Sequence, residues 1–416
     1  MPGKRGTTRI NGVLIKELHS PEAFPEDLTL RIPHGGGPSI WSIPGGNGAS
    51  SNQFAVVADI NGGVENYGGD KQNNSCPCGL NLSIHPVKEI LGNYQAIRMI
   101  ETSSQPEGFT WKGSAADEGC YVVADGICET PSNFDSLGIR YGVSIRLSHE
   151  LSARWFSGRM DSPTFDISKS TNGVFTYNIE GSPIEVPEYQ GSLNWNQIPS
   201  EIQKKLQTLG QAPSYVAPDM LDSNGNLVKW VSSVTPGGRV NMYLSADDPV
   251  ALTWLGIWMP MLGQVPNRMN TYWNMRDVWY DVPRRQCFYN DGGLFAGVST
   301  TNAIAYSSGP PVFSKGTLDY QVGATHFNSD DQILKGTYNI LMRTDVARCI
   351  YSLKAGPIIG SVSITDDSGK ANIATVSSTE KNGWVRVSAN GFHYSLSTIK
   401  LKLEAKPTKE TAKKKP

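Results

Sequence analysis

The alternation of hydrophobic and polar residues predicts β-strands along most of this chain. Residues 54–60 form a short apolar run that ends at a glycine-rich turn, and residues 141–147 alternate between apolar and polar side chains. Segments of the same kind recur at 80–84, 164–167, 175–179, 295–299, 318–322, 338–342, 358–364, 372–376, 384–387 and 399–403. Short strands at this spacing are typical of β-sandwiches, so we expect a mainly β fold with sandwich-type domains.

Helical periodicity is confined to the middle of the chain. Residues 199–209 have an amphipathic pattern that stops at Gly210, which predicts a short helix. A second helix is expected to begin at Pro249 and to end at Pro260 and Gly263, with Trp258 on its apolar face.

These patterns divide the chain into five predicted regions. The C-terminal sandwich is expected to be immunoglobulin-like, and the Lys-rich tail is expected to be disordered because it has no apolar periodicity. The tail would solubilise the protein or dock on an acidic surface. The regions are an N-terminal arm at 1–30, a β region at 31–190, a helical and aromatic-rich insertion at 191–285, the sandwich at 286–405 and the tail at 406–416.

Composition and charge restrict the classes of partner. Charged residues make up 18% of the chain, below the usual quarter, and the net charge of −1 gives no global attraction to nucleic acid or to an anionic membrane. No apolar stretch approaches the length of a membrane span. We therefore expect a glycan or protein ligand, no nucleic acid, no membrane span and, as a further option, self-association.

The six cysteines predict disulfides. An even number without a zinc-binding spacing fits three disulfides and an oxidising compartment, although free thiols or a metal site are alternatives. Cys287 and Cys349 are expected to pair because both lie in the C-terminal sandwich, and Cys120 is expected to pair with Cys128. Two cysteines then remain, which would bond to each other or across to the second pair: Cys76 and Cys78.

Localisation is predicted to be extracellular or at the cell surface. This prediction follows from the cysteines. The first twenty residues lack the apolar core of a signal peptide, and a leader that was removed or mis-called would reconcile this with the prediction. A cytosolic protein with reduced thiols is the alternative.

The most unusual segment is aromatic and runs from Trp254 to Tyr280. Trp258 lies on the apolar face of the predicted helix and is expected to be core. Trp273 and Trp279 follow a proline among Asn and Arg residues, so we interpret them as exposed rings in a loop. With two arginines they form our predicted ligand-binding surface: Trp273, Trp279, Arg276 and Arg268. A purely structural role for these aromatic residues is the alternative.

Several stretches resemble known proteins. Residues 151–160, 299–306, 336–350 and 380–389 are similar to a family of mostly secreted actinobacterial proteins of uncharacterised function. The resemblance covers about residues 140–405. It implies a secreted protein but supplies no activity.

No catalytic motif is evident. The histidines do not form metal-binding pairs, no nucleophile elbow is present, and no cofactor or metal is predicted. A glycan hydrolase would need only two carboxylates. The candidates lie in one β-rich stretch: Asp161, Asp166, Glu180, Glu185 and Glu188.

The sequence therefore favours a non-catalytic secreted or cell-surface protein. It would bind a glycan or a protein through its aromatic-rich surface. A glycan-acting hydrolase and a structural assembly subunit, which buries strand edges against copies of itself, are the alternatives.

Overall fold

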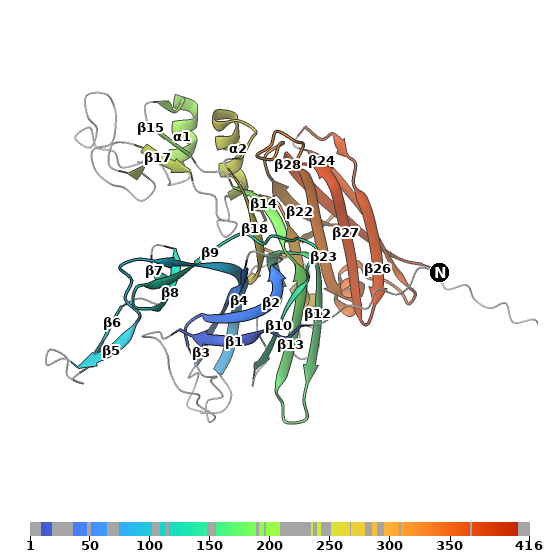
Figure 1. Ribbon diagram of the computed structural model, residues 1–416. Coiled ribbons are helices and arrows are strands. Elements are labelled where there is room, and N and C mark those ends of the chain that lie inside the picture. The colour runs from blue at the N-terminus through green and yellow to red at the C-terminus, as the bar shows by residue number, and fades with distance from the viewer. Residues whose placement is uncertain are drawn as a thin grey trace, which may run out of the picture.

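The protein is mainly β, as the sequence predicts (Figure 1). In the computed structural model, described residues are 10–18, 36–47, 51–64, 75–101, 109–113, 116–117, 119–147, 151, 155–188, 191–194, 197–208, 234–235, 239–242, 251–266, 268–278, 285–288, 295–307, 309–366 and 368–406. Most of the predicted arm and the predicted disordered tail, from residue 407 onward, lie outside these ranges.

The elements of the N-terminal half are almost all strands. They are β1 (Val13–Glu17), β2 (Ser39–Asn47), β3 (Ser51–Val64), β4 (Ser75–Leu91), β5 (Arg98–Glu101), β6 (Phe109–Lys112), β7 (Ala116–Asp117), β8 (Cys120–Ala124), β9 (Ile127–Pro131), β10 (Tyr141–Leu147), β11 (Trp155–Arg159), β12 (Asp161–Lys169), β13 (Phe175–Ser182), β14 (Ile184–Glu188) and β15 (Gly191–Asn194).

The middle region contains α1 (Ser200–Thr208), β16 (Val234–Thr235), β17 (Arg239–Met242), α2 (Ala251–Leu262), β18 (Arg268–Val278) and α3 (Arg285–Phe288). The C-terminal region contains β19 (Gly297–Thr301), β20 (Ala305–Tyr306), β21 (Val312–Ser314), β22 (Thr317–Gly323), β23 (Lys335–Arg343), α4 (Thr344–Tyr351), β24 (Ile358–Asp366), β25 (Ala371–Asn372), β26 (Thr375–Lys381), β27 (Trp384–His393) and β28 (Leu396–Ala405).

One large sheet connects the two halves of the chain. Its main path runs β1-β2-β3-β4-β18-β11-β19-β23-β27-β26, with β11 and β19 parallel. The sheet therefore crosses the predicted boundaries near residues 190 and 285, and β18, from the predicted helical insertion, lies between β4 and β11. This central strand was not predicted.

Two smaller sheets cover opposite faces of the large sheet. Alternate residues show this on β11, where Trp155 packs into one hydrophobic core and Phe156 into the other. The first core lies against helix α2 and the sheet β20-β22-β28-β24-β25, and the second lies against the sheet β10-β13-β12. The C-terminal half is thus a sandwich; its immunoglobulin-like character stays a prediction.

One side of this sandwich is closed by side chains. The backbone N–H of Ile358 on β24 donates to the Glu380 carboxylate on β26 at 2.6 Å, and the N–H of Gly360 donates to Ser378 Oγ at 2.8 Å. Arg348 of α4 donates to the other Glu380 oxygen at 3.2 Å. These bonds join the last strand of the large sheet to the second sheet.

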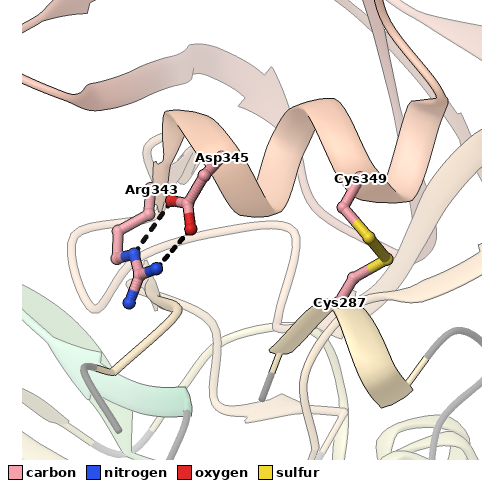
Figure 2. The surroundings of a disulfide bond; sticks show 4 residues. All are labelled: Cys287, Arg343, Asp345 and Cys349. Atoms are coloured by element: carbon pink, nitrogen blue, oxygen red, sulfur yellow. Dashed lines mark hydrogen bonds and ion pairs between the residues drawn. A yellow bond between two sulfur atoms is a disulfide. The ribbon is translucent and has the colours of Figure 1, made fainter. Parts of the chain in front are cut away.

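Two predicted disulfides are present. Cys287 and Cys349, with Cα atoms 5.5 Å apart, join α3 to α4 (Figure 2). Cys120 and Cys128 join β8 to β9. The alternative in which this second pair bonds across to Cys76 and Cys78 is therefore wrong. The side chains of those two residues lie outside the described part of the chain.

The end of helix α2 agrees with the prediction. The helix ends at Leu262, directly before Gly263 at φ +97°, and Pro260 lies in its last turn. Helix α4 was not predicted. Figure 2 shows Arg343, just before α4, paired with Asp345 in its first turn, where a carboxylate also suits the helix dipole.

Replacing Cys287 and Cys349 with serine should lower the free energy of unfolding by about 4 kcal/mol, because the disulfide closes a long loop in the unfolded chain. Denaturant unfolding measures this loss. Replacing Cys120 and Cys128, which lie 8 residues apart, should cost less. Equal losses from the two pairs would contradict the chain-entropy argument.

Candidate functional site

The predicted ligand-binding segment is a buried strand and not a loop. Strand β18 pairs with β4 on one side and with β11 and β14 on the other. Trp273 is fully buried in the second core, and its indole N–H donates to the carbonyl oxygen of Gly181 at 2.9 Å. The prediction of an exposed Trp273 ring is therefore wrong, since both faces of the central sheet are covered.

The helical tryptophans are also core. Trp258 is 3% exposed, as predicted, and its ring stacks on Trp254 with centroids 6.2 Å apart. Trp279 lies outside the described residues. Among the described aromatic residues of this segment, the structural alternative holds for the tryptophans.

The two predicted arginines lie at different depths on β18. Arg276 is half-buried and pairs in register with Ser157 of β11. Arg268 is exposed at the start of the strand, and its Nε donates to the Glu188 carboxylate of β14 at 2.5 Å. The two arginines lie far apart along the strand, and Trp273 is buried in the core. The three residues therefore do not form one site.

Arg268 belongs to a polar cluster with Glu188 and Tyr272. The Tyr272 hydroxyl donates to the second Glu188 oxygen at 2.5 Å. Partial burial favours the neutral form of Glu188, but hydrogen bonds from Tyr272, Arg268 and Asn270 outweigh it and lower its pKa. Burial, followed by the hydrogen bond to Glu188, raises the pKa of Tyr272 to about 12. The cluster thus holds a carboxylate ionised and a phenol protonated at neutral pH.

Arg159 extends this cluster into the sandwich. Its guanidinium lies 5.7 Å from the centre of the Tyr272 ring and 5.3 Å from that of Tyr306. The same group donates to the carbonyl oxygens of Ala303 at 2.5 Å and Ile304 at 2.9 Å. Arg159 therefore has defined partners on several sides, which fixes the orientation of Tyr272.

The remaining predicted carboxylates do not converge on Glu188. Asp166 and Glu180 point away from the core on the outer face of the sheet β10-β13-β12, because their strand neighbours Phe165 and Ile179 point inward. Glu185 is exposed on β14. The other candidate, Asp161, accepts a hydrogen bond from the buried amide of Asn339 at 3.2 Å.

The described residues lack two further features that would indicate a function. No group of three or more His, Cys, Asp or Glu side chains that could hold a metal occurs there. No helix in that part of the chain is long and apolar enough to cross a membrane.

The clearest exposed apolar feature is strand β1. Four side chains between residues 10 and 15 are each 47–64% exposed: Ile10, Val13, Leu14 and Ile15. Strand β1 pairs with β2 and begins the path of the large sheet, and within the described residues no strand pairs with its outer edge. These residues belong to the predicted N-terminal arm, where no exposed apolar strand was predicted.

Trp273→Ala should lower the free energy of unfolding by about 3–5 kcal/mol, because it removes a large, fully buried ring from a covered sheet. Thermal or denaturant unfolding measures the loss, with Trp258→Ala as the matched core substitution. A Trp273→Ala protein as stable as the wild type would contradict the burial of this ring.

Glu188→Gln should destabilise the protein by about 1–3 kcal/mol at neutral pH, because it removes a charged hydrogen-bond acceptor. The pKa of Glu188 is lowered on folding, so its contribution is present above its ordinary pKa of 4.5 and is lost as the pH falls. The melting temperatures of the wild type and Glu188→Gln should therefore differ at pH 7 and converge in acid. Glu185→Gln, which changes an exposed neighbour on β14, should show no such pH-dependent difference from the wild type.

Comparisons with known proteins give no match. No protein-family model, no curated protein and no solved structure matches this chain. The resemblance to secreted actinobacterial proteins therefore stays an expectation from the sequence, and the function is argued from the structure alone.

Proposed function

We propose that this protein is a non-catalytic structural subunit that associates with a second copy of itself through strand β1. The observation that carries the proposal is the exposed apolar edge at Ile10, Val13, Leu14 and Ile15. An edge strand offers unpaired backbone groups to another strand, and exposed apolar side chains beside it add burial when a partner docks.

A second copy is the favoured occupant for two reasons. The opposite end of the large sheet is joined to the neighbouring sheet by Glu380 and Ser378, whereas no described strand pairs with the outer edge of β1. A two-fold pairing also places the same apolar patch on both sides of the interface, so that each copy covers the other. Antiparallel pairing centred on Ile15 would continue the sheet across the dimer.

The other predicted functions have less support. The ligand-platform proposal is weakened because Trp273 is buried in the core. Within the described residues, the exposed Arg268 lies in the same cluster as Tyr272 and Asn270, and Trp279 lies outside those residues. A two-carboxylate hydrolase needs facing acids, whereas Asp166 and Glu180 lie on the outer face of a sheet. We retain an extracellular or cell-surface location as part of the proposal, because two disulfides suit an oxidising compartment.

Charge on β1 should abolish self-association. We expect wild-type protein to form dimers or larger assemblies in light scattering coupled to gel filtration, with the fraction rising with concentration. The double variant Leu14→Lys/Ile15→Lys should be monomeric with an unchanged melting temperature, because both side chains are exposed.

The matched control is Ile373→Lys. Ile373 is 88% exposed but lies far along the chain from β1, between β25 and β26, so this variant should associate like the wild type. A monomeric wild type at high concentration would overturn the proposal. Monomeric protein that captures a membrane or an unrelated protein through β1 would replace the second copy with that occupant.

A further inference from the structure

Strand β4 places His85 at the contact between a hairpin and the large sheet. Strands β8 and β9 pair as a hairpin, and β9 joins this hairpin to β4. His85 lies directly opposite the fully buried Ala55 of β3 and shares its face of β4 with Val87, which is 2% exposed. Ala55 and Val87 belong to one small hydrophobic core, against which Tyr121 and Val123 of β8 pack. His85 therefore lies beside the core that holds the hairpin on the sheet.

Within the described residues, the imidazole of His85 has no partner that would stabilise a charge. The residue is half-buried. Burial lowers the pKa of its imidazole below the ordinary 6.5, and no hydrogen bond or charge from the described part of the chain contributes to this shift. A neutral imidazole fits beside apolar side chains, whereas an imidazolium would lose its hydration there. His85 is therefore neutral in the folded protein at neutral pH.

The hairpin is attached to the sheet by one strand pairing and by two small cores. Strand β9 pairs with residues 87–91 of β4. One core lies under Tyr121, and the other contains the Cys120–Cys128 disulfide and packs against Ile90 of β4. The disulfide joins β8 to β9 and joins neither strand to the sheet. Because each core is small, weakening one of them changes how often the hairpin opens.

We propose that His85 is an acid-sensitive latch, whose protonation loosens the hairpin β8–β9 on strands β3 and β4. Histidine is the side chain that ordinarily changes its charge between pH 5 and 8. When the hairpin opens, water reaches the ring, which then takes up a proton more readily than in the closed hairpin. The stabilising contribution of His85 is therefore present above its ordinary pKa of 6.5 and is lost as the pH falls towards the folded value. This latch is separate from β1 and does not depend on self-association.

Other titratable groups point to the same side of these strands. By their register they are Lys16, Asp59, Glu89, Tyr121 and Glu129. Burial raises the pKa of Tyr121, which keeps the phenol protonated in neutral and acidic solution. Burial, followed by the charge of Glu89, also raises the pKa of Glu129, so Glu129 stabilises the folded protein as the pH falls. This effect is opposite in sign to that of His85, so Glu129 would not explain a hairpin that opens in acid.

The test is hydrogen–deuterium exchange of the wild-type protein at pH 7.5 and at pH 5.5, followed by mass spectrometry. Protection of the amides of β8 and β9 is corrected for the pH dependence of exchange in an unstructured chain. We expect this protection to fall about tenfold at the lower pH, because the open hairpin binds a proton at the ordinary pKa of 6.5 and the closed hairpin does not.

Two variants separate His85 from other groups. His85→Gln cannot acquire a charge, so its hairpin should be equally protected at the two pH values. His393→Gln, which changes an exposed histidine at the end of β27, should behave like the wild type. Wild-type protection that does not fall in acid, or a fall that persists in His85→Gln, would overturn the proposal.

An NMR titration of the wild-type imidazoles gives a second measurement that does not depend on the folding of a variant. We expect the His85 ring to titrate below its ordinary pKa of 6.5. A His85 ring that titrates at or above this value would mean that the closed hairpin accepts the charge, and the latch would be ruled out.

Discussion

The central strands of the large sheet are covered on both faces, and the rest of the structure follows from that constraint. Trp155 and Phe156 are consecutive on β11, and each is 1% exposed in a different core. Such large neighbours need space in the adjacent strand. A Cβ atom on Gly297 would lie 2.5 Å from the Trp155 ring, so only glycine fits there. Burial on both faces of these strands thus decides where large side chains and glycine residues occur.

The same constraint explains which strands the sequence reveals. Strands with one solvent face, such as β10 and β28, alternate cleanly and were predicted within a few residues. Apart from Arg268 at its start, strand β18 has no exposed residue. Its polar side chains instead form hydrogen bonds with neighbouring strands. For example, the Asn274 side chain accepts a hydrogen bond from the backbone N–H of Arg159 at 3.1 Å. The buried alternation of Trp273 and Met275 was the available signal, but the surrounding Asn and Arg residues concealed it.

Pairings between distant segments could not be read from spacing alone. Arg268 and Glu188 were both candidates, yet their ion pair spans 80 residues and depends on the register between β14 and β18. The Cys287–Cys349 disulfide was predictable because both cysteines were assigned to the same predicted C-terminal sandwich. Helix α4, which carries Cys349, was missed because its eight residues directly follow a strong strand pattern.

The two ends of the large sheet differ in how their edges are treated. At β26, the Glu380 and Ser378 side chains accept part-buried hydrogen bonds from the backbone of β24 and so join this end of the sheet to the second sheet. At β1, the pairing with β2 is irregular near Leu14, and the apolar side chains face outward. Exposed apolar edges expose a protein to aggregation, and natural sheets usually carry charges or proline there. In the proposed dimer, a second copy would bury these apolar side chains, which is why this edge supports the proposal.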